Sequence, residues 1–202
     1  HKRPDRLART MAESSVTVAH FVPSAFPAFV QAADVQALSA LRLLAFSGEA
    51  LTPDLLAAFE DRFADHPAAL VNLYGPTETA IEVSCWQHRR GQVPARVPIG
   101  TAIDGVRLSV RDAWLDPVAA GAAGEICIGG VAVGWGYVGR PGATAAAFRP
   151  DPAGPPGARL YRTGDLGAVG ADGQILYLGR RDRQVKLRGQ RLRLSGLPDL
   201  HV

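Results

Sequence analysis

The chain has 202 residues, 47% of them hydrophobic and 20% charged, with a formal net charge of +3, which is ordinary for a soluble globular protein. These values argue against a disordered chain and against a membrane protein, because no apolar run approaches the roughly 18 residues needed to span a bilayer. The two cysteines, Cys85 and Cys127, are too few for a disulfide framework or a zinc site, and without a charged-then-apolar leader they favour a cytoplasmic protein.

Helix and strand signals alternate in the first part of the chain. Helices are expected over residues 4–15, 25–30 and 53–63. Thr52 is a good N-cap for the last of these, with Pro53 at its first helical position. Short buried strands are expected over residues 16–21, 41–46 and 70–74. This alternation predicts an α/β fold with a parallel sheet flanked by helices.

The pattern changes after about residue 90. Short alternating strands separated by glycine and proline are expected over residues 106–110, 124–128 and 174–178. Asp172-Gly173 is a strong hairpin signal, and residues 151–158 are too rich in proline and glycine for regular structure. This part predicts a small antiparallel barrel or sandwich.

Seven basic residues cluster near the end of the chain: Arg180, Arg181, Arg183, Lys186, Arg188, Arg191 and Arg193. Such a strip can bind nucleic acid. The aromatic residues that stack on bases are absent from it, so nucleic-acid binding is not expected. The alternation of basic and apolar residues also fits a solvated strand pair.

The strand expected over residues 70–74 runs into the sequence NLYGPTETA, where a glycine and a proline make a tight turn. A sharp turn after a parallel strand projects side chains into the crevice where such sheets bind ligands. Tyr74 offers a flat face for a base, Thr77 a hydroxyl for a phosphate, and Glu78 a hard oxygen for magnesium. Alternatively, Glu78 simply begins a helix.

A second motif is YRTGDL at residues 161–166, followed by DGQILYLGR at residues 172–180. Asp165 follows a glycine turn, and an ionised carboxylate there can accept both hydroxyls of a ribose. In the alternative interpretation, the Asp165 side chain only forms a hydrogen bond with its own backbone within the turn.

Taken in order, these motifs resemble the core motifs of the adenylation domains of nonribosomal peptide synthetases. SGEAL at residues 47–51 and GEICIGGVAVGWGYVGRP at residues 124–141 belong to the same series. The phrases HFVPSAF at residues 20–26 and TAAAFRPDP at residues 144–152 favour this branch of the acyl-adenylate-forming ligases, which also include acyl-CoA synthetases and luciferase. The resemblance covers residues 1–194.

The resemblance implies a domain organisation. Residues 1–95 would be the α/β portion of the large subdomain of an adenylate-forming enzyme, with a mostly parallel sheet and flanking helices. Residues 96–179 would be a small antiparallel β-barrel-like portion of the same subdomain. Residues 180–202 would contain the hinge and the start of the small C-terminal subdomain. The family usually has an acidic segment where this chain has LRLSGL, so its last eight or so residues depart from the pattern.

The implied reaction joins an amino acid to ATP and releases pyrophosphate, with Mg²⁺ as the cofactor. The aminoacyl group then passes to the phosphopantetheine thiol of a peptidyl carrier domain, and a condensation domain of the same synthetase is a further expected partner. Neither nucleic acid nor membrane is an expected partner. The family's glycine-rich phosphate loop and adenylation lysine would lie before residue 1 and beyond residue 202, so the isolated chain is expected to be inactive in pyrophosphate exchange.

The resemblance assigns roles to individual residues. The implied ATP-binding residues are Gly48, Asn72, Tyr74, Gly75, Thr77, Asp165, Tyr177 and Arg180. Among them, Tyr74 would stack on adenine, Thr77 would touch the α-phosphate and Asp165 would bind the ribose hydroxyls. The implied catalytic residues are Thr77, Glu78 and Lys186, with Glu78 as the magnesium ligand and Lys186 acting in thioester formation. Asp182 matches the hinge.

The implied substrate pocket consists of His20, Ala45, Ser47, Leu73, Ile81 and Glu82. Four of these resemble the pocket of serine-activating domains, whereas Glu82 stands where those domains carry Asp and Ala45 replaces a bulky residue. Serine or a small polar relative is therefore expected, and the alternative is a basic diamino acid. Since burying an unpaired carboxylate is costly, Glu82 should meet a donor on the substrate, or else a protein group or water.

Two other functions stay open at this point. An acyl-CoA or aryl-acid ligase of the same superfamily would lack the aspartate that binds a substrate amino group. A non-catalytic remnant would fold, at most bind a partner domain, and catalyse nothing.

Overall fold

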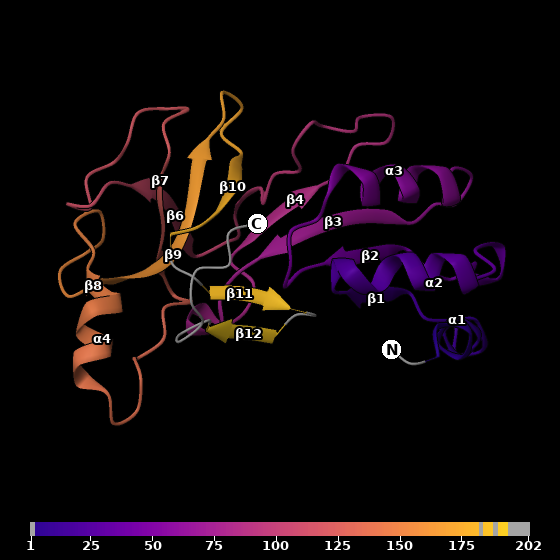
Figure 1. Cartoon of the computed structure of the whole chain (residues 1–202), viewed down its shortest axis with the longest axis horizontal. Helices are drawn as coiled ribbons and strands as arrows, with labels where there is room; N and C mark the ends of the chain where they lie inside the picture. The colour runs from indigo at the N-terminus through magenta and orange to yellow at the C-terminus, as the bar shows by residue number, and fades with distance from the viewer. Residues whose placement is uncertain (1–2, 182–183, 188–189, 194–202) are drawn as a thin grey trace, which may run out of the picture.

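A computed structural model describes residues 3–181 and the backbone of residues 184–187 and 190–193. These residues form two five-stranded sheets and a two-stranded hairpin (Figure 1). The first sheet contains both parallel and antiparallel strands and is flanked by helices, and the second sheet is antiparallel. The predicted α/β fold class is therefore confirmed.

The first sheet has a parallel part and an antiparallel edge. Its strands are β1 (Val18–Phe21), β2 (Leu43–Phe46), β3 (Ala69–Tyr74), β4 (Ser84–Gln87) and β5 (Thr101–Ala102), in that order. The three predicted strands are the parallel ones, shortened by two residues at the start of β1 and β2. Strands β4 and β5 run antiparallel and were not predicted, because they are short and carry no sustained alternation.

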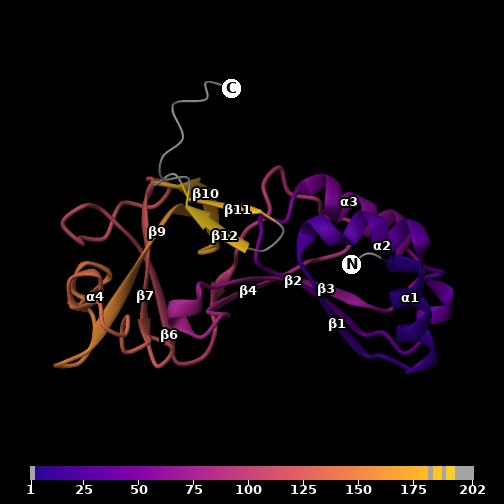
Figure 2. The same ribbon diagram turned by 60° about the horizontal axis from the view of Figure 1, so that its bottom comes forward.

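The helices cover one face of this sheet (Figure 2). They are α1 (Pro4–Glu13), α2 (Phe26–Ala32) and α3 (Pro53–Arg62), with 3₁₀ turns η1 (Pro23–Ala25) and η2 (Gln36–Leu38) between them. As predicted, Thr52 caps α3, its Oγ1 accepting the Leu55 N–H at 3.4 Å. A fully buried phenylalanine cluster, which includes Phe26, Phe46 and Phe59, fills the space between helices and sheet.

The opposite face of the same strands carries a different set of side chains. Phe21, Phe46 and Asn72 point towards the helices, so the alternate residues point away from them. His20 and Ala45 are direct neighbours on that second face, across β1 and β2. This alternation separates the predicted substrate-pocket residues from the helix-side core.

The second sheet is a curled antiparallel sheet. Its order is β10 (Ile175–Arg180), β9 (Arg159–Val169), β7 (Gly124–Gly130) and β6 (Val106–Arg111), and β8 (Phe148–Pro150) pairs with β9. The predicted hairpin joins β9 to β10, with Gly173 at φ +77°. Helix α4 (Pro141–Ala147), which precedes β8, was not predicted.

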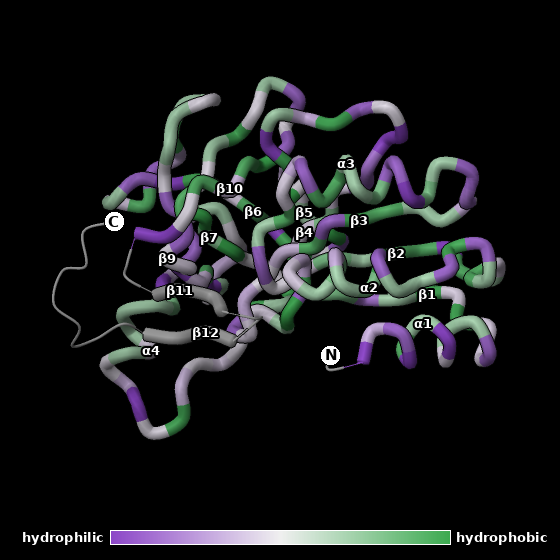
Figure 3. The backbone as a smooth tube through the Cα atoms, turned by 45° about the vertical axis from the view of Figure 1, so that its right-hand side comes forward, coloured by the Kyte–Doolittle hydropathy of each residue, from purple (hydrophilic) through white to green (hydrophobic). Residues whose placement is uncertain are grey.

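The two sheets share a core at the end of β3. Tyr74 of β3 and Val83, which directly precedes β4, pack into a buried cluster with Ile126, Tyr161 and Ile175 of the second sheet. Figure 3 shows hydrophobic residues along parts of β2, β3 and β7. The end of β3 therefore lies against the second sheet, where the two predicted nucleotide motifs can meet.

The basic stretch forms a hairpin. Strands β11 (Gln184–Leu187) and β12 (Gln190–Arg193) pair antiparallel, as the strand-pair reading of this segment predicts. Across the described residues, every helix is too short or too polar to cross a membrane.

Candidate functional site

The two predicted nucleotide motifs meet in the structure. The Tyr74 hydroxyl donates a hydrogen bond to Asp165 Oδ2 at 2.6 Å, although the two residues are 91 positions apart. Arg180 donates from Nη1 to the other oxygen, Oδ1, also at 2.6 Å. Asp165 is only 3% exposed, so both carboxylate oxygens lie in protein surroundings. An ionised carboxylate has about four acceptor positions, so these two bonds leave it able to accept more.

Asp165 lies on a β-bulge, so the turn that the sequence predicts at Gly164 is wrong. Strand β9 continues through the motif for eleven residues. Glu125 of β7 faces Leu166, and Cys127 faces Arg162, so three residues of β9 stand opposite the single β7 residue between them. The three are Thr163, Gly164 and Asp165.

The Thr163 side chain replaces hydrogen bonds that the bulge removes between β9 and β7. Thr163 Oγ1 donates to the Ile126 carbonyl at 2.7 Å and accepts the Asp165 N–H at 2.9 Å. Gly164 has φ +73°, a conformation that costs glycine little. The bulge therefore turns the Asp165 carboxylate towards Tyr74 and Arg180.

A hollow of about 660 Å³ lies beside this contact, a size usual for small-molecule sites. Six of the predicted ATP-binding residues line it: Gly48, Asn72, Tyr74, Gly75, Tyr177 and Arg180. Gly48 follows β2 and Gly75 follows β3, and neighbouring parallel strands end at the same edge of a sheet. Asp165 does not line the hollow itself, but it bonds two residues that do.

The sequence did not predict the loop that forms another wall of the hollow. Ala95, Arg96, Val97 and Ile99 line it. The Asn72 side-chain amide donates to the Pro98 carbonyl at 2.7 Å and so fixes this loop against β3. A run of proline and apolar residues was the only signal in the sequence, and it does not specify a ligand.

Glu78 lies in the 3₁₀ turn η3 (Thr77–Thr79) and does not begin an α-helix. The Tyr137 hydroxyl donates to Glu78 Oε1 at 2.8 Å, and the Gly134 N–H donates to the Glu78 carbonyl at 2.9 Å. The loop containing Gly134 and Tyr137 therefore holds both the side chain and the main chain of Glu78. Thr77 is exposed at the start of the turn.

The residues present fit magnesium in one way. Within residues 3–181, no group of three His, Cys, Asp or Glu side chains converges on a metal position. Magnesium is commonly held by one or two carboxylates together with the phosphates of its substrate. Glu78 alone therefore fits a Mg²⁺ ion that arrives with ATP.

Three of the predicted substrate-pocket residues come together. His20 Nε2 lies 2.7 Å from Ser47 Oγ and 4.0 Å from Glu82 Oε1. Ala45 pairs with His20 in the sheet, and Leu73 lies on the same face of β3. Ile81 is 61% exposed in the turn just before Glu82.

This turn is strained. Ala80 and Ile81 have φ +60° and +78°, a region that side chains disfavour and β-branched residues most of all. Val83 N–H closes the turn by donating to the Tyr74 carbonyl at 2.8 Å. A Cβ at Gly75 would lie 2.0 Å from the Ile81 carbonyl oxygen. The strained turn therefore sets the position of Glu82, and its close approach to residue 75 is possible only with glycine there.

Tyr74 should make the protein sensitive to alkali. Burial, and then the negative charge of Asp165, raise the pKa of Tyr74 well above its usual value of 10.0. Below pH 10 the Tyr74 phenol is protonated in both the folded and the unfolded protein, so it does not lower the free energy of unfolding there. Above pH 10 the unfolded phenol ionises first, so the free energy of unfolding should fall by about 1.4 kcal/mol per pH unit. Urea unfolding between pH 8 and 11 should show this slope, and Tyr74→Phe should reduce it; equal slopes would contradict the assignment.

For two predicted residues the structure describes no side chain. Asp182 is outside the described residues, and for Lys186 only the backbone, within β11, is described.

Comparisons with known proteins agree on one family. The family described as AMP-binding enzyme matches residues 1–138. Over 96% of its length the chain is 50% identical to phosphinothricin tripeptide synthetase PhsB of Streptomyces viridochromogenes, of which it covers 16%. Among solved structures, IdnL1 has a TM-score of 0.87 at 33% identity, covering 96% of this chain and 41% of that one. PA1221, a nonribosomal peptide synthetase protein containing adenylation and PCP domains, has a TM-score of 0.85 at 31% identity, covering 95% and 33%. The chain thus spans less than half of each relative.

Proposed function

Because the chain belongs to the AMP-binding enzyme family, in the part that nonribosomal peptide synthetase adenylation domains share, we propose that it is part of a domain that activates an amino acid with ATP. In this reaction a carboxylate oxygen of the amino acid attacks the α-phosphorus of ATP. Pyrophosphate leaves, and an aminoacyl-adenylate forms. The observation that carries the proposal is the bond from Tyr74 to Asp165 beside a nucleotide-sized hollow.

The hollow supports a nucleotide position. The adenine would lie against the Tyr74 ring, with Asn72 at its edge, and Tyr177 packs 6.4 Å from that ring. The ribose hydroxyls would donate to Asp165, whose carboxylate keeps acceptor capacity beside its Tyr74 and Arg180 contacts. Binding both ends of the nucleoside would fix the α-phosphate and reduce the entropic cost of alignment.

The phosphates would lie towards Thr77 and Glu78. A carboxylate nucleophile approaching a polyanion is repelled, so the site must neutralise charge. Magnesium supplies that neutralisation when bound with ATP. Glu78 would hold it, and the Tyr137 hydroxyl would keep Glu78 in place. Thr77 would donate its hydroxyl to an α-phosphate oxygen.

The amino acid is proposed to be serine or a small polar relative. The proposed pocket contains hydrogen-bond donors and acceptors, because His20 Nε2 lies 2.7 Å from Ser47 Oγ and 4.0 Å from Glu82 Oε1. Such a pocket suits a substrate hydroxyl, which both donates and accepts. Ala45 and Leu73 on the same face would limit the size of the side chain.

The second half-reaction is also part of the proposal. PA1221 contains both adenylation and PCP domains, which supports a carrier-domain partner here. The aminoacyl group would pass to its phosphopantetheine thiol, with Asp182 at the hinge and Lys186 acting in this step. A condensation domain of the same synthetase is proposed as a further partner, and the protein is proposed to be cytoplasmic. The proposed boundaries lie near residue 95, between the α/β portion and the β-barrel-like portion, and near residue 179, before the hinge.

Pyrophosphate exchange tests the function. The protein containing this chain with its natural flanking segments should incorporate labelled pyrophosphate into ATP only when the right amino acid is present. Serine should give the highest rate. Exchange driven by acyl or aryl acids instead would overturn the amino-acid assignment, and the absence of exchange with every acid would overturn adenylation itself.

A further inference from the structure

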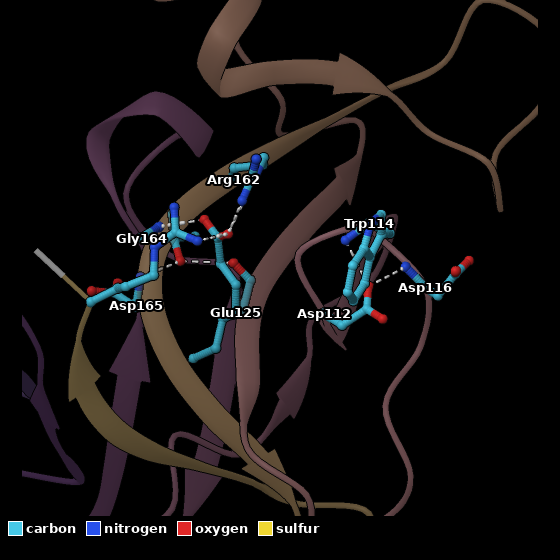
Figure 4. Close-up of polar contacts among 10 residues, drawn as sticks. Asp112, Trp114, Asp116, Glu125, Arg162, Gly164 and Asp165 are labelled. Atoms are coloured by element: carbon cyan, nitrogen blue, oxygen red, sulfur yellow. Dashed lines mark hydrogen bonds and ion pairs between the residues drawn. The ribbon is translucent and has the colours of Figure 1, made fainter.

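Glu125 is a buried carboxylate at the back of the Asp165 bulge. It lies at the start of β7 and is 5% exposed. Its Oε1 accepts the Gly164 N–H at 3.0 Å, and its Oε2 accepts Arg162 Nη2 at 2.6 Å and Nε at 3.1 Å (Figure 4). Arg181 Nη1 lies 3.7 Å from the same oxygen. Glu125 thus contacts the residue just before Asp165.

A carboxylate in this place needs an explanation. Burying a charged group is costly unless it is paired and hydrogen-bonded, and an apolar residue at the same position would avoid that cost. The bulge provides a reason, because it removes Gly164 from the cross-strand ladder. The Gly164 N–H would then be a partly buried donor without a strand partner, and Glu125 satisfies it.

The same carboxylate connects the bulge to the end of β10. Arg180 pairs with Asp165, and its neighbour Arg181 approaches Glu125. The Arg181 N–H also donates to the Gly164 carbonyl at 2.9 Å. The peptide units on both sides of Gly164 are therefore held, the one before it through the Gly164 N–H by Glu125 and the one after it through the Gly164 carbonyl by Arg181. Together these two contacts fix the backbone angles of Gly164, and so the direction in which the chain enters Asp165.

We propose that Glu125 is a positioning residue, which orients the Asp165 carboxylate for the ribose hydroxyls by holding the Gly164 N–H and so the backbone that leads into Asp165. This inference rests on the proposed function, in which Asp165 binds the ribose. Without Glu125, the Gly164 N–H loses its acceptor, the bulge relaxes, and Asp165 keeps its charge but loses its orientation.

A second ion pair with a buried carboxylate, between Arg107 and Asp151, provides the control. Asp151 follows β8, has a 3% exposed side chain, and accepts a hydrogen bond from Arg107 Nη2 at 2.5 Å. Its side chain bonds Arg107 and the Ala153 N–H, and among residues 3–181 it does not line the hollow. Asp151→Ala therefore removes a comparable carboxylate and should lower stability without affecting ribose recognition.

The test compares affinities for ATP and 2′-deoxy-ATP, measured by calorimetry on the protein with its natural flanking segments. A hydrogen bond to a charged group supports a wild-type preference for ATP of about tenfold or more. Asp165→Ala and Glu125→Ala should both reduce this preference to near unity, and Asp151→Ala should keep it. Glu125→Gln, which retains an acceptor for the Gly164 N–H, should lie between wild type and Glu125→Ala and serves if Glu125→Ala does not fold.

The outcomes separate the two claims. If Asp165→Ala leaves the preference unchanged, the proposed ribose site is wrong. If Asp165→Ala removes the preference while Glu125→Ala and Glu125→Gln keep it, Glu125 has only a structural role and this inference is overturned. An equal loss in Asp151→Ala would also overturn it, since general loosening of the sheet would then explain the effect.

Discussion

Gly75→Ala should abolish most of the adenylation activity. The added Cβ would lie 2.0 Å from the Ile81 carbonyl oxygen and 3.0 Å from Glu82 Cα, and both are backbone atoms that cannot rotate away. The strained turn must therefore move by about 1 Å or more, and a misplacement of that size costs about 10²-fold in rate. Overpacking should also lower the free energy of unfolding by about 1–3 kcal/mol. Exchange kinetics and urea unfolding measure the two effects.

Gly142→Ala is the matched control. Gly142 lies in the first turn of α4, and a Cβ there would meet nothing within 4 Å. Alanine is a better helix former than glycine by about 1 kcal/mol, so this variant should be as stable as wild type or more so, with full activity. If Gly75→Ala were equally active, the turn before Glu82 would not be fixed by this contact.

Local sequence signals predicted the parts of the site that depend on strand ends. Apolar runs stopped by glycine marked β2 and β3, and their loops line one hollow because parallel strands end at a common edge. Tyr74 was placed in this way, whereas the role of Gly48 came from the family resemblance. The helix cap at Thr52 was equally local, and the structure has it as predicted.

The bulge at Asp165 could not be predicted from local signals. A glycine followed by an aspartate is typical of a turn, and the sequence was interpreted as one. Only the pairing of β9 with β7 shows that the strand continues with three residues opposite one. Glu125 reaches Gly164 across 39 positions, and Tyr137 reaches Glu78 across 59. Such contacts follow from tertiary packing, which neither periodicity nor turn chemistry encodes.

Strain is the other feature that the sequence did not indicate. Ala80 and Ile81 are not residues that favour a positive φ, and nothing in the letters TAIE marks an unusual turn. The conformation is imposed by β3 and β4, which pair on either side of it. Positions where local preference and structure disagree in this way are often functional, and here they precede Glu82.

Glu82→Ala should collapse the preference for serine over alanine. In the proposed pocket the serine hydroxyl donates to the Glu82 carboxylate, and a hydrogen bond to a charged group contributes about 1.5–3 kcal/mol. The variant should therefore lose about 10- to 100-fold in kcat/KM for serine and change little for alanine, which has no hydroxyl. Serine- and alanine-dependent pyrophosphate exchange measure both values in one preparation. A parallel loss for the two amino acids would mean that Glu82 supports the fold of the pocket and does not contact the side chain.

Glu82→Gln separates serine from a diamino acid. Glutamine keeps an oxygen that accepts from a hydroxyl, so serine activation should fall by less than about tenfold. An ammonium group needs the negative charge, and removing one partner of a buried charge pair costs about 2–5 kcal/mol, so diaminopropionate activation would fall by about 30-fold or more. His20, 4.0 Å from Glu82, remains in both cases and keeps the pocket polar. If wild type favours diaminopropionate and Glu82→Gln loses it selectively, the carboxylate binds an amine, and the proposed serine specificity is wrong.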